Sequence, residues 1–379
     1  MLQFCIGLLV GVRPLRNVGR DRDPVELPLR DGRGLNHPPT RTAVHRAIRE
    51  LAAQMRLLLP PLLVAIGTLR PSLQSAHRFD GVSMSSVASE PRICAPGTFA
   101  SQIEEAVCAV YGAKGTGRVR RSLSALSDGV ELNRPIDDSG HDLMVQQANS
   151  YIEELTPKPW HDAGRHKWAS KLEQKWTVVR DELRKNLRDA SLESRGNNVW
   201  GGLQSDRVEY GSDWKTLPLC DRTVWDETNS ALFPKTCALL TKSKVPLLEA
   251  FFAKMPPKTT IKPHSDMCNF VLTCHLGVDV PEGQCDLTVG DETRAWQNGN
   301  VMLFDTSILH SAENRADVTR YILMLRVYHP ELSAIERSAM QLVFDLLDEP
   351  ELLSDSEALG EYDQRRRALE KASRGAWGG

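Results

Sequence analysis

From Leu217 onward the chain is a series of short apolar segments separated by turn-forming residues, and this pattern restricts the possible folds more than any other feature. Short segments of this kind, ended by Gly, Pro, Asn or Asp, are typical of β-strands. Many such strands at close spacing indicate a sandwich or barrel, here a double-stranded β-helix, or jelly roll. The expected strands are Ala250–Met255, Phe270–Leu276, Cys285–Val289, Val301–Phe304 and Tyr321–Val327, with turns at Pro256–Pro257, Glu282–Gly283, Gly290–Asp291 and Asn298–Gly299.

His264, Asp266 and His310 form a candidate metal site within this region. The first two lie two residues apart, so an extended strand points both side chains the same way. A separate strand must bring His310 alongside them. Two imidazoles and one carboxylate on one face of a metal ion are typical of Fe(II) oxygenases, which keep other positions open for a co-substrate and dioxygen. The alternative for a histidine in such a region is a hydrogen-bonded core residue.

Arg320 opens the apolar run Tyr321–Val327 and is the candidate anion-binding residue. A cation buried with that run would need a partner. A guanidinium binds a carboxylate through two parallel hydrogen bonds. The alternative is an arginine at a strand end that faces solvent.

A set of short motifs between Leu155 and Leu346 resembles the aspartyl/asparaginyl β-hydroxylase family of 2-oxoglutarate- and Fe(II)-dependent dioxygenases. The motifs occur in the family's order and at roughly its spacing over about half of the chain. They are Pro157–Trp160, Gly211–Trp214, Phe233–Cys237, Lys262–His264, His275–Val278, Gly290–Thr293 with Trp296, Phe304–Ser307, His310, Arg320 and Tyr328–Leu332.

The resemblance implies a mainly β, jelly-roll, cupin-like core with flanking N-terminal helices, and it implies roles for individual residues. His264 and His310 match the family's iron ligands, and Arg320 and His275 match its 2-oxoglutarate site. Asp266 matches a glycine of the animal peptide hydroxylases, so the aspartate here would complete a metal triad. Its alternative role is to orient His264 or to cap a turn. The implied reaction consumes dioxygen and hydroxylates a peptide or protein side chain.

Three departures from the family put the substrate in doubt more than the reaction. The segment Asn269–Thr273 contains no arginine, whereas the animal enzymes carry arginines there that hold acidic groups. Ala253 stands where a serine is often found, and Thr306 replaces the second acid of an Asp-Asp pair. Two alternatives therefore stay open: the same chemistry on a lipid acyl chain or small molecule, and a catalytically silent jelly-roll binding module.

Composition narrows the possible partners and cofactors. The formal net charge of −2 over 379 residues gives no bulk attraction to nucleic acid, so no nucleic-acid partner is expected. The eight cysteines form no CxxC pair, which argues against a structural zinc site. They are either disulfide-bonded in a secreted protein or buried as small apolar residues.

Outside the motif region, 1–90 is expected to be a targeting or disordered extension, and 91–150 a helical linker region. Residues 55–76 begin with a short basic segment, continue with an apolar core and end in small residues, which is the layout of a secretory signal. The apolar run is too short for a stable membrane span. Secretory or organellar targeting and a cytoplasmic location both stay open. The catalytic domain is expected at 151–346, followed by a peripheral charged tail at 347–379.

Overall fold

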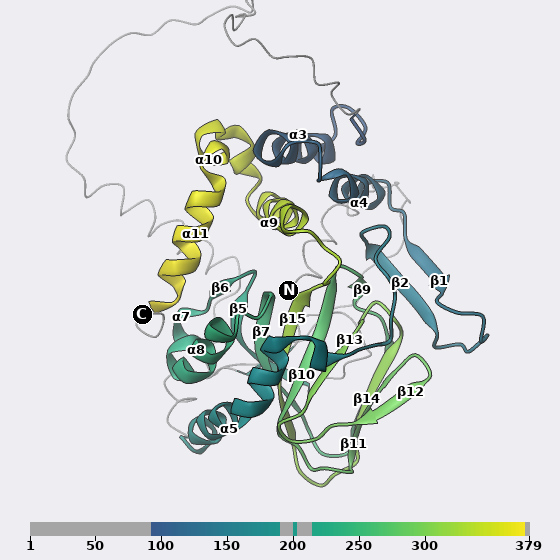
Figure 1. Ribbon diagram of the computed structural model, residues 1–379, viewed down its shortest axis with the longest axis vertical. Helices are drawn as coiled ribbons and strands as arrows, with labels where there is room; N and C mark the ends of the chain where they lie inside the picture. The colour runs from purple at the N-terminus through teal and green to yellow at the C-terminus, as the bar shows by residue number, and fades with distance from the viewer. Residues whose placement is uncertain (1–91, 190–199, 203–213, 376–379) are drawn as a thin grey trace, which may run out of the picture. The chain divides into compact units, whose positions relative to one another are not determined.

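The computed structural model describes residues 92–189, 200–202 and 214–375, which belong to one unit of the chain (Figure 1). The predicted extension 1–90 and its possible signal segment at 55–76 lie outside the described residues. Seven cysteines lie in the described part, and all seven are free thiols.

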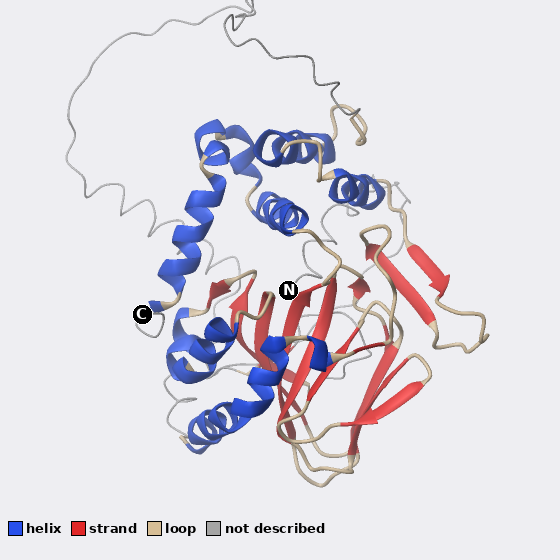
Figure 2. Ribbon diagram, in the orientation of Figure 1, coloured by secondary structure: helices blue, strands red, loops and turns tan. Residues whose placement is uncertain are grey.

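Eight strands form the central part of the fold, and they lie in two antiparallel sheets (Figure 2). All five apolar runs that the sequence predicts as strands form strands here. The eight are β7 (Leu247–Met255), β8 (Thr259–His264), β10 (Val271–Asp279), β11 (Cys285–Val289), β12 (Glu292–Ala295), β13 (Val301–Phe304), β14 (His310–Asn314) and β15 (Arg320–Tyr328).

The strand order identifies the fold as a jelly roll. One sheet contains the order β13-β10-β15-β7, and the other has the order β12-β11-β14-β8. Apart from the β11–β12 hairpin, successive strands therefore pass back and forth between the two sheets, which is the arrangement of a double-stranded β-helix. The larger sheet is extended by β3 (Trp160–His161) beyond β13 and by β5 (Lys215–Asp221) and β4 (Gly201–Gly202) beyond β7, and β6 (Val224–Trp225) pairs with β5.

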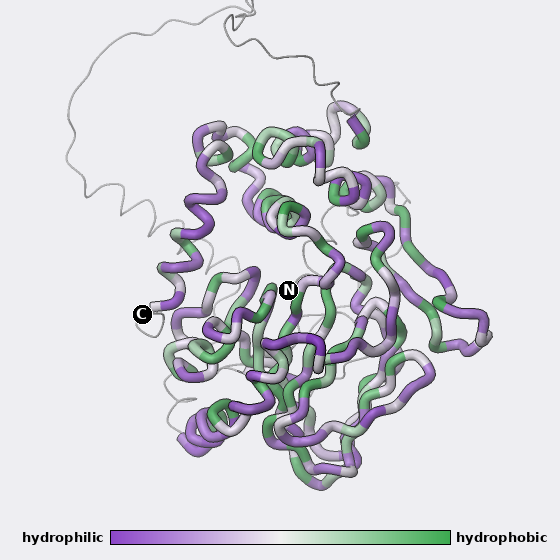
Figure 3. Tube along the Cα trace, viewed as in Figure 1, coloured by the Kyte–Doolittle hydropathy of each residue, from purple (hydrophilic) through white to green (hydrophobic). Residues whose placement is uncertain are grey.

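The larger sheet is apolar on both faces because each face is covered. Alternate residues of a strand point to opposite faces, so Ala250 and Phe252 join one core and Ala253 and Met255 another. The outer core packs against α5 (Lys167–Arg188) and α8 (Pro234–Ser243), and Figure 3 shows the apolar strands alongside these amphipathic helices. The inner core fills the space between the two sheets. Replacing a fully buried outer-face residue such as Leu272 with Ala would cost about 2–5 kcal/mol.

The helical region predicted before the barrel contains two helices and a hairpin. α3 (Phe99–Tyr111) and α4 (Gly117–Ser127) are separated by a short break that begins at Gly112, which has φ 77°. The second half of 91–150 instead forms β1 (Leu132–Pro135) and β2 (Val145–Ser150), which the interpretation as a helical linker did not include. Polar residues dominate both strands, so their sequences carry little apolar signal.

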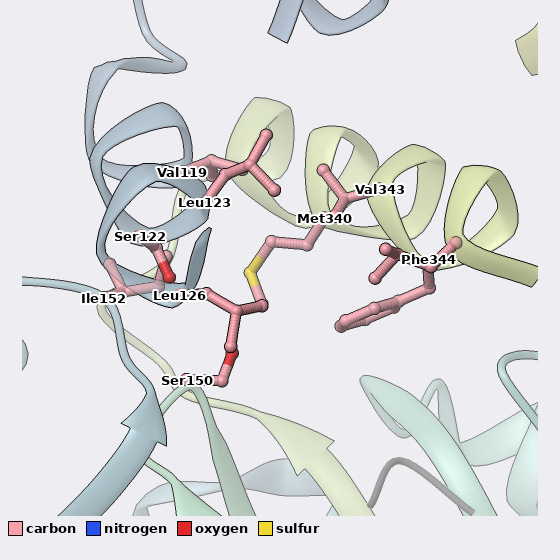
Figure 4. A pocket seen from close by; sticks show the side chains of 10 residues that line it. Val119, Ser122, Leu123, Leu126, Ser150, Ile152, Met340, Val343 and Phe344 are labelled. Atoms are coloured by element: carbon pink, nitrogen blue, oxygen red, sulfur yellow. The ribbon is translucent and has the colours of Figure 1, made fainter. Parts of the chain in front are cut away.

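The hairpin and the terminal helices build a third layer. β1, β2 and β9 (Met267–Cys268) form a three-stranded sheet. α3 and α4 pack on α9 (Ala334–Asp348), and a small apolar pocket between α4, α9 and the end of β2 is lined by residues such as Leu123, Ile152 and Met340 (Figure 4). The remaining helices are η1 (Ala163–Arg165), α7 (Glu227–Leu232), η3 (Pro350–Ser354), α10 (Ser356–Gly360) and α11 (Tyr362–Ser373).

The C-terminal tail contributes to packing. Tyr362 of α11 is buried, and its hydroxyl donates a hydrogen bond to Asp345 of α9 at 2.5 Å. Within the described ranges, no helix has both the length and the apolar character needed to cross a membrane.

Candidate functional site

Strand pairing brings the three predicted metal ligands together. β8 ends at His264 and β14 begins at His310, and these two residues are directly opposite each other in the antiparallel pair. Their rings lie with centroids 4.2 Å apart. Asp266 follows β8 immediately, and candidate ligand atoms of all three side chains lie within 4.8 Å of one another. Each residue is about 7% exposed, so the cluster is a buried group of two nitrogen donors and one oxygen donor that can hold a metal ion.

Backbone carbonyls orient both histidine rings in the same way. Nδ1 of His264 lies 2.7 Å from the carbonyl oxygen of Lys262, and Nδ1 of His310 lies 2.9 Å from that of Ile308. A carbonyl oxygen only accepts, so each Nδ1 carries the proton and donates. Nε2 of each ring therefore keeps its lone pair, which is the atom a metal requires.

Burial keeps His310 in its neutral form. The pKa of His310 is lowered to about 4, first because the ring is desolvated and second because His264 lies beside it. A metal binds the neutral imidazole, so a lowered pKa removes competition from protons near neutral pH.

The carboxylate of Asp266 lies between a histidine and an arginine. Its Oδ1 is 3.9 Å from Nε2 of His264, and its Oδ2 accepts a hydrogen bond from Nη1 of Arg326 at 2.9 Å. Arg326 also lies 3.7 Å from Glu249 through its Nε, and all three charged side chains are buried. Asp266 therefore pairs with Arg326 through one carboxylate oxygen and lies next to His264 through the other.

Arg320 lies on the inner wall of the barrel without a carboxylate partner among the described residues. It is 2% exposed, and its Nε has no hydrogen-bond partner within the described part of the chain. Its guanidinium carbon lies 4.5 Å from the centre of the Trp296 ring. Burial lowers the pKa of Arg320 to about 10, which still leaves it charged near neutral pH.

His275 lies on the same wall and offers a second buried donor. The indole nitrogen of Trp296 donates to Nδ1 of His275 at 3.3 Å, so the neutral His275 ring carries its proton on Nε2. In the described part of the chain, that Nε2 has no hydrogen-bond partner. Burial, then the charge of Arg320, hold the pKa of His275 well below its ordinary value. Arg320 and His275 thus leave donors on the inner wall that a bound anion can satisfy.

β2 forms hydrogen bonds with both of the loops that lead to the candidate metal ligands. Ser265 donates from its Oγ to the carbonyl oxygen of Gln147 at 2.6 Å. Gln147 in turn donates its backbone N–H to the carbonyl oxygen of Ser307 at 2.7 Å. The side chain of Gln146 donates to Oγ of Ser307 at 2.9 Å, and that Oγ donates to Asp305 at 2.5 Å. β2 therefore links the loop after His264 to the loop before His310.

Sequence reasoning did not single out Arg326, Glu249 or β2. One signal was present for Arg326, because it is a charged residue inside a long apolar strand. It is six positions after Arg320, so the two side chains lie on the same face of the strand. A charge buried in this way requires a partner. No comparable signal identifies β2, because its contribution comes from backbone groups and amides.

Comparison with known proteins finds a family model that matches part of the chain. Residues 173–330 match the sequence model described as Aspartyl/Asparaginyl beta-hydroxylase. The Aspartyl/asparaginyl beta-hydroxylase of Mus musculus is 28% identical over 212 residues, which cover 54% of this chain and 28% of that protein. Human Aspartate beta-hydroxylase domain-containing protein 2 is 32% identical over 140 residues, covering 35% of this chain and 38% of that protein. The matched part thus spans well under half of either relative.

A bacterial relative is matched over more of its length. The Ornithine lipid ester-linked acyl 2-hydroxylase of Rhizobium tropici is 29% identical over 191 residues, which cover 49% of this chain and 66% of that protein. Among solved structures, a Cupin 2 conserved barrel domain protein from Salinispora arenicola is 11% identical, covers 38% of this chain and 98% of its own, and has a TM-score of 0.23. The fold assignment therefore rests on the strand order. Residues 173–330, which contain the His264, Asp266 and His310 cluster together with His275 and Arg320, match the aspartyl/asparaginyl β-hydroxylase family model, and the relatives named above support that similarity.

Proposed function

We propose that this protein is a 2-oxoglutarate- and Fe(II)-dependent hydroxylase that acts on a peptide or protein side chain. His264, Asp266 and His310 would hold the iron. Arg320, with His275 beside it, would bind the distal carboxylate of 2-oxoglutarate. The catalytic residues are thus the three metal ligands, and the co-substrate residues are the two donors of the inner wall.

The donor set fits Fe(II). Two neutral imidazoles and one carboxylate on one side of the ion leave other coordination positions open, as non-haem Fe(II) oxygenases require. Both Nε2 atoms are oriented by hydrogen bonds from Nδ1 to backbone carbonyls, which is the usual support for a metal-binding histidine. Bound Fe(II) would supply the oxidation of an unactivated C–H bond by dioxygen, coupled to conversion of 2-oxoglutarate to succinate.

The pair of unsatisfied donors on the inner wall is the observation that carries the proposal. Arg320 and His275 are both buried, and each leaves a nitrogen without a hydrogen-bond partner among the described residues. An isolated buried cation is costly, so its presence favours a ligand that brings a carboxylate. The chain's own residues would bind and orient that carboxylate, and the apolar walls around Phe304 and Trp296 would exclude water.

A lipid acyl chain is the second candidate substrate. The segment Asn269–Thr273 contains no arginine, whereas the animal enzymes carry arginines there for acidic groups, and Val271 and Thr273 within it are fully buried and uncharged. The relative from Rhizobium tropici, by its name, hydroxylates an ester-linked acyl chain of an ornithine lipid. These two observations favour an uncharged substrate segment at this position.

The first experiment measures co-substrate binding without oxygen and then turnover with it. Purified protein is titrated anaerobically with Fe(II) and 2-oxoglutarate, and succinate release is measured after oxygen is admitted. His264→Ala and His310→Ala should each abolish succinate release while leaving the protein folded. Asp266→Ala should weaken metal binding and keep some activity. The control is His141→Ala, because His141 is exposed on the hairpin loop and should be neutral.

The outcomes separate the three functions. Succinate release stimulated by peptides containing aspartate or asparagine supports the proposal, and stimulation only by ornithine lipid supports the second candidate. A protein that binds neither Fe(II) nor 2-oxoglutarate and releases no succinate would be a silent binding module, which contradicts both.

A further inference from the structure

β15 places two arginines on the inner face of the barrel, and the proposed function uses only one of them. Residues 320, 322, 324 and 326 share a face because side chains alternate along a strand. Arg320 lies at the start of β15, opposite Met255, and Arg326 lies near the other end, opposite Glu249 on β7 and Thr273 on β10. Arg326 is thus at the end of the barrel where Asp266 lies.

The contacts of Arg326 reach two other strands, β7 and β9, and the loop that follows β8. Nη1 donates to Oδ2 of Asp266 at 2.9 Å, and Nη2 lies 3.1 Å from Sγ of Cys268 on β9. Nε lies 3.7 Å from a carboxylate oxygen of Glu249, and the side chains of Arg326, Asp266 and Glu249 are 10%, 7% and 8% exposed. One guanidinium therefore lies between two buried carboxylates, one of which belongs to the metal cluster.

We propose that Arg326 is a positioning residue of the metal centre: by holding Oδ2 of Asp266, it presents Oδ1 as the single oxygen ligand. This inference rests on the proposed function, because it assigns Asp266 to the metal. Oδ1 is the oxygen that lies 3.9 Å from Nε2 of His264, and ligand atoms of His264, Asp266 and His310 lie within 4.8 Å of one another. Glu249 holds Arg326 from the opposite side.

Single-oxygen ligation matters for the chemistry of this site. A carboxylate that bound through both oxygens would occupy an additional coordination position, and the proposed reaction needs open positions for 2-oxoglutarate and dioxygen. A guanidinium is suited to this task because its planar, fixed donors hold a carboxylate in one orientation. Lysine would keep the charge but would hold the carboxylate through a single flexible ammonium group.

The test is a double-mutant cycle on metal affinity, measured with Co(II) in the absence of 2-oxoglutarate. Replacing a group that orients a metal ligand typically weakens metal binding about tenfold to a hundredfold. Arg326→Met should therefore weaken Co(II) binding by about that factor and change the visible absorption of bound Co(II). In the Asp266→Ala background, Arg326→Met should have little further effect, because the residue acts through that carboxylate. Arg326→Lys should fall between the wild type and Arg326→Met.

A second buried ion pair provides the matched control. Arg120 and Glu104 are each 2% exposed and lie 2.9 Å apart in the helical layer. Arg120→Met removes an equally buried arginine and should lower the free energy of unfolding without changing Co(II) affinity or absorption. Glu249→Gln keeps the shape of Glu249 but removes its charge, and it should weaken Co(II) binding less than Arg326→Met does.

Three results would overturn the inference. Unchanged Co(II) affinity in folded Arg326→Met, tighter binding in that variant, or an equal loss in the Asp266→Ala background would each show that Arg326 does not act through Asp266. The proposed function fails separately, and this inference with it, if the wild-type protein binds no Co(II) or Fe(II). The proposed function survives, and only the inference about Arg326 fails, if wild-type metal binding and succinate release are normal while the double-mutant cycle shows no coupling.

Discussion

At Arg320 a full positive charge lies against the face of Trp296, with burial lowering its pKa to about 10. Such a charge is tolerated when a ligand supplies the opposite one. The neighbouring His275 adds a neutral donor, because its proton resides on Nε2. At the scale of single residues, the site thus combines one charged and one neutral donor for a carboxylate.

Arg320→Lys should raise the 2-oxoglutarate concentration needed for half-maximal succinate release about tenfold to a hundredfold. Lysine keeps the charge but loses the two-donor fork, and a charged hydrogen bond contributes roughly 1.5–3 kcal/mol. Arg320→Ala should raise that 2-oxoglutarate concentration further, and Co(II) affinity should be nearly unchanged in both variants. Arg315→Lys, at a surface arginine, is the control. Unchanged 2-oxoglutarate dependence in Arg320→Ala would leave His275 as the remaining candidate.

His161 gives the metal-free protein a defined response to acid. Its pKa is lowered to about 4, first by burial and second by the nearby His329. In the window between about pH 4 and 6.5 the unfolded chain therefore binds more protons at this position than the folded chain does. The contribution of the neutral His161 ring to the free energy of unfolding is fully present above about pH 6.5 and is lost as the pH falls towards 4.

His161→Gln should make the loss of stability between pH 6.5 and 4.5 shallower in urea unfolding. The loss should not disappear, because the pKa values of His310 and His329 are also lowered. His141→Gln, at an exposed histidine, should leave the pH dependence as it is. Identical pH profiles for His161→Gln and the wild type would contradict the assignment.

At the scale of elements, β2 is the strand that connects the two loops that carry the candidate metal ligands. The side chain of Gln146 on β2 is 1% exposed. Its amide nitrogen donates to Oγ of Ser307, and its amide oxygen accepts from Nη2 of Arg134 on β1 at 3.0 Å. The partner strand β9 adds a parallel pair directly after Asp266. The geometry of the site thus depends on a strand that lies outside the residues matched by the family.

Gln146→Leu should destabilise the protein by about 0.5–1.5 kcal/mol, because it removes the buried hydrogen bond from Gln146 to Oγ of Ser307, which then keeps its bond to Asp305. It should also weaken Co(II) binding, since Ser307 belongs to the loop that leads to His310. Asn133→Ala, at an exposed residue of the same hairpin, serves as control for both measurements. Lower stability with unchanged Co(II) affinity would mean that β2 supports the fold but not the metal centre.

At the scale of the whole molecule, the helical layer closes one side of the barrel through a shared apolar core. α3 contributes Ile103 and Val107 to a cluster that also contains Phe270 of the β9–β10 segment and Phe344 of α9. Residues from both ends of the described chain therefore stabilise the same region.

A chain that begins at Arg92 should keep the unfolding midpoint and the Co(II) affinity of the full chain. A chain that begins at Gly117 lacks α3 and should be destabilised by more than about 3 kcal/mol, since burying one large apolar side chain contributes about 1.5–3 kcal/mol. Urea unfolding of both truncated chains measures the difference. Equal free energies of unfolding for the two truncated chains would show that α3 does not contribute to the stability of the core.

The sequence by itself determined the β-strands with apolar cores, the helices with a 3.6-residue period, and the types of residue that a metal and a dicarboxylate require. These features are local: an apolar run between turns such as Cys285–Val289, or a helix such as α5 with Leu172 and Val179 on one face, is readable from neighbouring residues. His264, Asp266 and His310 were predictable as a cluster because their chemistry is distinctive. The strands β8 and β12 carried little signal, since exposed polar residues interrupt them.

Only the tertiary structure decided which groups surround those residues. The pairing of Asp266 with Arg326, the opposition of Arg326 and Glu249, and the contacts of β2 with Ser265 and Ser307 join segments far apart in the chain. Such contacts depend on strand register, and a register shift by one residue would turn each side chain to the other face of its sheet. The sequence therefore determined the donors, and strand pairing determined how they are held.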